Sequence, residues 1–214
     1  FRMTADILPF THGTYIGSLD ENGLSFINTA SDTSQYKNIA SDISKNAYVT
    51  YILALVDSAF NDGRSIGGWF NQVAAALDLI EKGLDEQITN IIETQLLVAF
   101  GVAPIWDRCV VCGRNDLALD FSEQYGGMLC QNHWSLDEHR LHLDRKTVYY
   151  LQQFATINLQ KLNSIRINPA TKRRLQQVLD TLYDNEVGLN LKAKRFIRQM
   201  NKWEQNIGKL SMND

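Results

Sequence analysis

The sequence has 214 residues, enough for one large domain with attachments, and its 44% hydrophobic and 21% charged residues are typical of soluble globular proteins. No apolar run approaches the ~20 residues that span a bilayer, and no signal peptide opens the chain, which argues against a membrane or exported protein. The formal net charge of −3 hides an asymmetry: residues 161–214 carry 11 Lys and Arg against 5 Asp and Glu, whereas residues 1–160 carry 10 against 19. A basic carboxyl-terminal region indicates a surface for an acidic partner.

The first thirty residues predict a β-hairpin. β-branched and aromatic residues dominate 10–19 and 24–29, and the turn-forming residues 20–23 join them. A lone hairpin is marginal in water, so we expect it to belong to a larger sheet. The chain opens at Phe1 without an initiator Met, and we therefore expect that an earlier part of a β domain is absent.

Residues 33–107 are predicted to be helical. Apolar residues at helical spacing mark a first helix from Tyr36 to Asn61, a second from Ile66 to Gly83 and a third from Ile88 to Gly101. Residues 61–65 are expected to break the first helix from the second. Between residues 47 and 60 the segment is apolar nearly all round, which predicts that the first helix is central and buried.

The helical pattern resumes in the last third of the chain. One helix follows Asp144, and Asn168-Pro169 has the residue types that begin another. The last helix is predicted to begin near Asn190 and to bury four apolar side chains: Phe196, Ile197, Met200 and Trp203.

The spacing of all three cysteines and one histidine predicts a metal site. Cys109 and Cys112 form a C-x2-C pair, and Cys130 and His133 form a C-x2-H pair after seventeen intervening residues. Two such pairs are typical of one tetrahedral zinc site, and Gly113 supplies the backbone freedom that the first turn needs. Four protein ligands leave no position for water, so we predict a single structural Zn²⁺ and no hydrolytic metal.

The fourth ligand has an alternative in the sequence. His139 and His142 follow closely, and either could replace His133, although the pairwise spacing favours His133. Short strands are expected at 117–121 and after 125–129, so residues of about 105–143 would form a zinc-ribbon-like insert. Such a ribbon is too short to bury a core, and the metal would supply its stability. Cysteines used as ligands favour a reducing compartment, and we expect a cytoplasmic protein.

Two helices near the carboxyl end carry a predicted nucleic-acid surface. The first of these helices begins with three cations: Lys172, Arg173 and Arg174. The last helix carries five on its expected outward side: Lys192, Lys194, Arg195, Arg198 and Lys202. If the two helices pair, these eight cations share one neighbourhood that could follow a phosphate backbone. A solvated face kept charged for solubility is the alternative.

The chain resembles the RecO family of bacterial DNA repair and recombination mediators over nearly its whole length. The resemblance rests on Leu8-Pro-Phe10 before the hairpin, Phe100-Gly-Val-Ala-Pro104, Cys109-x2-Cys112-Gly113, Phe121-Ser122, Gly126-Gly127-Met-Leu-Cys130 and Leu191-Lys-Ala-Lys-Arg-Phe196. Each motif alone is weak, and their ordered combination is fairly specific. His133 stands where four-cysteine members have their last cysteine, which tetrahedral zinc tolerates.

The resemblance implies a mainly helical fold with a small β part and a mediator function. Residues 1–32 would be the carboxyl-terminal part of an OB-fold, and residues 33–214 a helical domain carrying the zinc-knuckle insert. Members bind single- and double-stranded DNA, anneal complementary strands and, with RecR and RecF, help load recombinase onto strands coated by single-stranded-DNA-binding protein. The location implied is the cytoplasm, in association with the nucleoid. The first OB strands, which would hold most of the DNA-binding groove, would be missing.

Two other functions compete with the mediator. One is a zinc-ribbon adaptor that binds only proteins. The other is a zinc hydrolase using Asp137, Glu138 and His139 near the metal. Annealing needs no nucleophile or general base, and the sequence has no G-x-S-x-G, Walker A or G-x-G-x-x-G motif, so we predict that the protein is not an enzyme.

Overall fold

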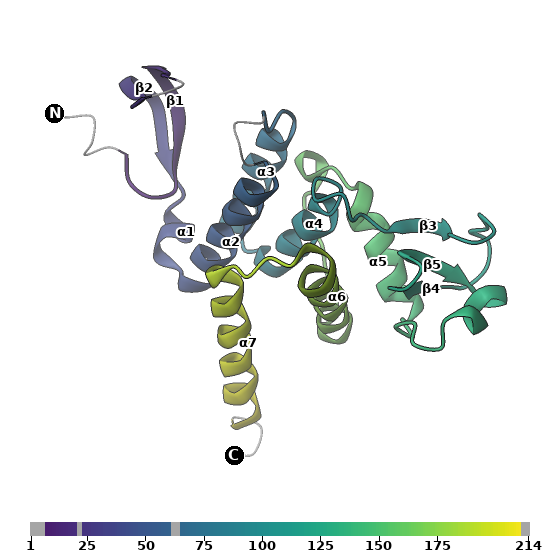
Figure 1. The fold of residues 1–214 in the computed structure, drawn as a ribbon. Coiled ribbons are helices and arrows are strands. Elements are labelled where there is room, and N and C mark those ends of the chain that lie inside the picture. Colours follow the sequence, from purple (N-terminus) through teal and green to yellow (C-terminus); the bar gives the residue numbers. More distant parts are fainter. Residues whose placement is uncertain (1–6, 21–22, 61–64, 211–214) are drawn as a thin grey trace.

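The computed structural model describes residues 7–20, 23–60 and 65–210, and shows a helical body with a small sheet toward either side (Figure 1). The helices are α1 (Lys37–Ser41), α2 (Ile43–Ala59), α3 (Trp69–Glu81), α4 (Asp85–Leu96), α5 (Arg145–Thr156), α6 (Pro169–Leu182) and α7 (Lys192–Leu210). Short helical turns are η2 (Gln131–Leu136), η3 (Leu159–Lys161) and η4 (Tyr183–Val187). The strands are β1 (Thr11–Ser18), β2 (Phe26–Gln35), β3 (Ile105–Cys109), β4 (Leu119–Ser122) and β5 (Gly127–Cys130).

The predicted mainly helical fold with a small β part is confirmed. Within the described residues, no helix combines the length and apolar character needed to cross a membrane.

The predicted amino-terminal hairpin is present. Strands β1 and β2 pair antiparallel, and β2 continues to Gln35, past the predicted end at residue 29. Two residues of the predicted turn, 21 and 22, lie outside the described residues. Gly17 permits the close approach of the strands, because a Cβ there would lie 2.2 Å from the carbonyl oxygen of Phe26. Most side chains of the hairpin are exposed on both faces.

The first helix predicted from the sequence is in fact two helices. Asp42 separates α1 from α2 in an extended conformation, and its carboxylate accepts hydrogen bonds from the backbone N–H groups of Ser44 and Lys45, at 2.8 and 3.1 Å. Asp42 is therefore the N-cap of α2, a role for which Asp is well suited. The predicted break at 61–65 falls mostly outside the described residues. The second and third predicted helices are confirmed as α3 and α4.

Helix α4, not α2, is the most enclosed helix of the body. It contacts α2, α3, α5 and α6, and every residue from Gln87 to Thr94 is buried. The predicted burial of α2 is confirmed by its eight buried residues and its contacts with α1, α3, α4 and α7. The greater enclosure of α4 was not predicted, because more than half of its buried residues are polar. Ile88, Ile91 and Ile92 are fully buried, but so is Glu93.

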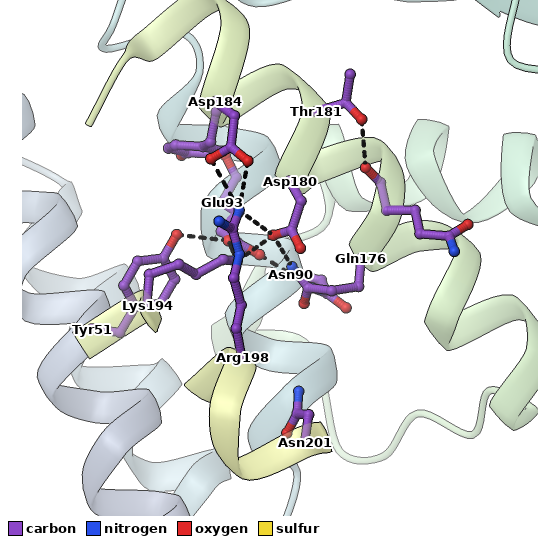
Figure 2. A network of polar contacts seen from close by, with 12 residues as sticks. Tyr51, Asn90, Glu93, Gln176, Asp180, Thr181, Asp184, Lys194, Arg198 and Asn201 are labelled. Atoms are coloured by element: carbon purple, nitrogen blue, oxygen red, sulfur yellow. Dashed lines mark hydrogen bonds and ion pairs between the residues drawn. The ribbon is translucent and has the colours of Figure 1, made fainter. Parts of the chain in front are cut away.

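The Glu93 carboxylate lies at the centre of a buried polar network that joins four helices (Figure 2). It accepts hydrogen bonds from the Tyr51 hydroxyl of α2 at 2.7 Å and from the Asn90 amide of α4 at 3.1 Å. The Lys194 ammonium of α7 forms a close ion pair with it. Because a buried carboxylate is costly unless it is paired and hydrogen-bonded, these partners decide whether Glu93 can stay inside.

Lys194 in turn connects α7 to α6. Its ammonium lies 3.0 Å from the Asp180 carboxylate and 4.8 Å from the centre of the Tyr51 ring. Burial acts to lower the pKa of Lys194, but the carboxylates of Glu93 and Asp180 outweigh burial and raise that pKa above its usual value. Burial, with the nearby Glu93 carboxylate, raises the pKa of Tyr51 well above its usual value. The lysine therefore stays charged and the tyrosine neutral inside the protein.

The exposure of two side chains of α7 differs from the prediction. Lys194 was expected on the outward side and is only 8% exposed, so that prediction is wrong. Trp203 was expected to be buried and is 63% exposed, because this end of α7 extends beyond the other helices (Figure 1). Ile197 and Met200 are buried, as predicted, where α7 packs on α2, and Phe196 is half-buried.

Replacing Lys194 with Met should lower the free energy of unfolding by about 3–5 kcal/mol, because Glu93 would remain as an unpaired buried charge. Replacing its exposed neighbour Arg195 with Met should change stability by less than about 0.5 kcal/mol. Urea denaturation of both variants and the wild type measures the difference.

The double variant Glu93→Gln with Lys194→Met removes both charges and should recover part of the loss, because no charge is then left unpaired. A Lys194→Met variant as stable as the Arg195→Met variant would contradict the central role of this pair.

Candidate metal centre and basic surface

Two turns bring three cysteines and one histidine together. Cys109 ends β3, Cys112 lies in the turn that follows, Cys130 ends β5, and His133 lies in η2. Gly113 has a left-handed backbone (φ 73°), and its N–H donates to the Cys109 carbonyl at 2.8 Å, which closes the first turn. The potential ligand atoms of the four residues all lie within 4.8 Å of one another. The metal cluster predicted from the sequence is therefore assembled in the structure and could bind a metal ion.

The distances inside the cluster suit a tetrahedral ion. The Sγ atoms of Cys112 and Cys130 are 3.7 Å apart, and the Nδ1 atom of His133 lies 3.5 Å from Cys109 Sγ and 3.2 Å from Cys130 Sγ. Bond lengths of ~2.3 Å to sulfur and ~2.0 Å to nitrogen in a tetrahedron place sulfurs about 3.8 Å apart and sulfur and nitrogen about 3.5 Å apart. The donor set and its spacing therefore fit Zn²⁺.

The backbone around Cys109 favours the thiolate, which is the form that binds metals. Burial acts to raise the pKa of the Cys109 thiol, but backbone N–H groups of Cys130, Cys112 and Val111 outweigh it and lower the pKa to about 6. By contrast, burial and the neighbouring thiols raise the pKa of Cys130. An ion bound among these sulfurs would stabilise the charged form of all three.

The strands of the insert form one small sheet. Strand β5 is in the middle, pairing parallel with β3 and antiparallel with β4. A ribbon of two strands was predicted, but β5 begins at Gly127, inside the segment that was expected to be a turn. Strand β3 beside it was not predicted. Gly127 allows the parallel contact, because a Cβ there would lie 2.8 Å from the Ile105 carbonyl oxygen. The buried cluster at the metal ligands consists of Cys109, Leu129 and Cys130, while Trp106, Phe121 and Met128 of the same strands pack into the core of the helical body.

Asp120 is a structural anchor of the insert that sequence reasoning missed. Its buried carboxylate accepts hydrogen bonds from the backbone N–H groups of Phe121, His142 and Leu143 at 2.8–3.0 Å. The Arg140 guanidinium lies 3.0 Å away and also covers the Trp134 ring. Asp120 thereby joins β4 to the segment that leads into α5. The sequence held no signal for it beyond an acidic residue in a short strand.

The alternative ligand His139 contributes a backbone hydrogen bond to Asp137 and is not part of the metal cluster. Its backbone N–H donates to the Asp137 carboxylate at 2.8 Å, and Asp137 also accepts a hydrogen bond from the Ser122 hydroxyl. The Ser122 hydroxyl is the main cause that lowers the pKa of Asp137. Among the residues that the structure describes, the metal cluster contains His133 and neither His139 nor His142.

The eight cations of the basic helices fall into two groups. Four are engaged within the protein: Lys194 in the buried network, Arg198 with Asp180 and Asp184, Lys172 with Glu86, and Arg174 with the Leu141 carbonyl and Gln177. The other four are exposed and form no ion pair with any side chain that the structure describes: Arg173, Lys192, Arg195 and Lys202. Helices α6 and α7 line a groove of about 390 Å³, with Arg173 and Lys202 among its lining residues.

Comparisons with known proteins place the chain in a family. The family described as "Recombination protein O C terminal" matches residues 40–195. The chain is 96% identical to a protein named "DNA repair protein RecO" from Limosilactobacillus reuteri (strain DSM 20016), over all of this chain and 82% of that protein. Proteins of the same name from Limosilactobacillus fermentum and Levilactobacillus brevis are 52% and 50% identical, over 97% of this chain and 76% and 80% of theirs. The chain belongs to the RecO family, which confirms the resemblance found in the sequence.

Replacing Asp120 with Ala should lower the free energy of unfolding by about 3 kcal/mol, because three backbone N–H groups would lose a charged acceptor. Hydrogen exchange should become faster in the β4 strand and at residues 140–143. Asp116→Ala, which removes an exposed carboxylate bound to Arg114, should change neither quantity. Equal effects of the two substitutions would contradict the anchoring role of Asp120.

Proposed function

We propose that this protein is a DNA repair and recombination mediator that acts without catalysis. It binds single- and double-stranded DNA, anneals complementary strands and helps load recombinase onto strands coated by single-stranded-DNA-binding protein, together with RecR and RecF. The family match over residues 40–195 carries this proposal, and the names of the similar proteins support it. The action takes place in the cytoplasm, on DNA of the nucleoid.

The geometry near the metal cluster supports a role without hydrolysis. Four side chains that fill a tetrahedral ion leave no position for an activated water. Asp137, a candidate base in the hydrolase alternative, accepts hydrogen bonds from Ser122 and His139 and is only 5% exposed. It holds the loop before α5 and has no free access to a substrate.

The amino-terminal hairpin is, in this proposal, the carboxyl-terminal part of an OB-fold. Its apolar side chains support this assignment, because Ile16, Phe26 and Ile27 are each more than half exposed. A two-stranded hairpin is marginal in water by itself, and further strands would cover these side chains. OB-folds bind single strands in a basic groove with stacking aromatics, so the hairpin would lie next to the main DNA contact.

The four exposed cations form the second DNA contact that we propose. Lys192, Arg195 and Lys202 lie at positions i, i+3 and i+10 of one helix, so they share a face of α7. Arg173 of α6 and Lys202 line the groove between the two helices. Lys172, Arg174, Lys194 and Arg198 are withdrawn from the predicted contact set, because each is engaged inside the protein.

The metal is proposed to be a single structural Zn²⁺. Metal analysis of the purified protein should give about one equivalent of zinc per chain, and Cys112→Ser should lose it. The insert should then exchange its backbone hydrogens faster, since its own core is too small to hold it. His139→Ala is the matched control and should keep the zinc. Loss of zinc from His139→Ala with retention in His133→Ala would reverse the ligand assignment.

The basic face is tested by the salt dependence of DNA binding. Each phosphate contact lowers log affinity by about 0.7 per unit of log salt on single strands and about 0.9 on duplex. Reversing Arg195 and Lys202 to Glu should therefore flatten the slope by one to two contacts, roughly equally for all sequences.

The control for charge is Lys37→Glu with Lys82→Glu, which changes the net charge equally at exposed positions of α1 and the end of α3. This variant should keep the slope of the wild type. If the Arg195 and Lys202 variant is folded and keeps that slope as well, the basic face is not a DNA contact, and the protein adaptor becomes the stronger alternative for this part of the chain.

A further inference from the structure

The three cysteines of the metal cluster differ in their access to solvent. Cys109 and Cys130 are 1% and 0% exposed, whereas Cys112 is exposed. Cys112 follows β3 in a surface turn, and its Sγ atom lies 3.7 Å from the Sγ atom of Cys130. An exposed cysteine thus has its sulfur next to that of a buried one.

An oxidant dissolved in water reaches these sulfurs in a definite order. Oxidation by hydroperoxides requires a thiolate that the oxidant can contact, and a metal-bound cysteine is already a thiolate. Cys109 and Cys130 are buried residues, so an oxidant in solution has little access to either. Cys112 is therefore the cysteine that an oxidant meets first.

We propose that Cys112 is an oxidation site for hydroperoxides and that Cys130 resolves it into a disulfide, which releases the metal. The proposal rests on the metal site proposed above. Neither role follows from membership of the family, and both follow from the exposure of Cys112 and from the distance of 3.7 Å between the two sulfur atoms.

The chemistry is balanced by one molecule of hydrogen peroxide. The Cys112 thiolate attacks one peroxide oxygen, the O–O bond breaks, and the departing hydroxide takes a proton to form water. The Cys130 thiolate then attacks the Cys112 sulfenic acid, forming the S–S bond and releasing a second hydroxide, which also takes a proton. Two sulfurs lose one electron each, and the peroxide is reduced to two waters.

Release of the metal would loosen the insert without unfolding the helices. Cys109, Leu129 and Cys130 form a small buried cluster at the metal end of the insert, whereas Trp106, Phe121 and Met128 belong to the large core of the helical body. Loss of two sulfur ligands removes the ion that holds both turns. The contacts with the large core and the link from Asp120 to the segment before α5 remain, so the change should be largest in the two ligand-bearing turns, at about 109–116 and 130–136.

The test uses the reduced protein with its metal content measured first. Hydrogen peroxide should remove two free thiols per chain and release the zinc in parallel, as followed with a thiol reagent and a zinc-sensitive dye. Peptide mapping by mass spectrometry should find the Cys112–Cys130 disulfide, and dithiothreitol with added zinc should restore the starting state. A zinc-loaded protein that neither releases metal nor forms this disulfide would overturn the proposal.

The variant Cys112→His keeps four ligands and removes the exposed thiolate. It should retain zinc and release it more slowly under peroxide, by roughly ten-fold or more. Release at the wild-type rate from the zinc-loaded variant would overturn the assignment of Cys112, as would a Cys109–Cys112 disulfide in the wild type.

The mapping of the wild type does not depend on the folding of this variant. A reduced protein that contains no metal would instead refute the proposed zinc site, and the disulfide map would still decide whether Cys112 and Cys130 react together.

Discussion

The arrangement of the helices depends on one buried ion pair, between Glu93 of α4 and Lys194 of α7. Glu93 is fully buried, and its partners come from α2, α4 and α7. Lys194 extends the network to Asp180 of α6. A charge in this position is tolerated only when all of its partners are present, so the pair requires that four helices take one relative placement. An apolar core alone would allow α7 to slide or rotate with a smaller penalty.

The metal insert depends on a different principle and is almost independent of that pair. Near the metal ligands the buried cluster has three residues, and order there comes from ligands on two turns and from the carboxylate of Asp120. The rest of the insert packs Trp106, Phe121 and Met128 into the core of the helical body. Substitutions in the buried network therefore act on the helical body as a whole, whereas changes at the metal cluster act first on the two turns that carry the ligands.

Much of this structure could be predicted from the sequence where the signal is local. The helices follow from apolar spacing, the metal cluster from the pairing of Cys109 with Cys112 and of Cys130 with His133, and the hairpin from its strand-forming residues. The clearest failure arises because a side chain's partner lies far away in the sequence. The cation of Lys194 looks like its neighbour Arg195 until Glu93, about a hundred residues earlier, is placed beside it. Likewise, the polar residues of α4 concealed that it is the most enclosed helix, and Trp203 has the residue type of a core position but extends beyond any partner.

The way in which the insert joins the helical body has an evolutionary consequence. Its first strand contacts α5 through Trp106, whose carbonyl accepts a hydrogen bond from Gln152, and its last residues are held by Asp120 just before α5 begins. Both ends of the insert therefore lie along the same helix. A segment whose ends are close together can change in length or lose its ligands without changing the path of the chain between α4 and α5. The turns that carry the ligands are thus free to diverge among relatives, while Trp106, Phe121 and Met128, which belong to the core, and the helices joined by Glu93 and Lys194 are constrained by their packing.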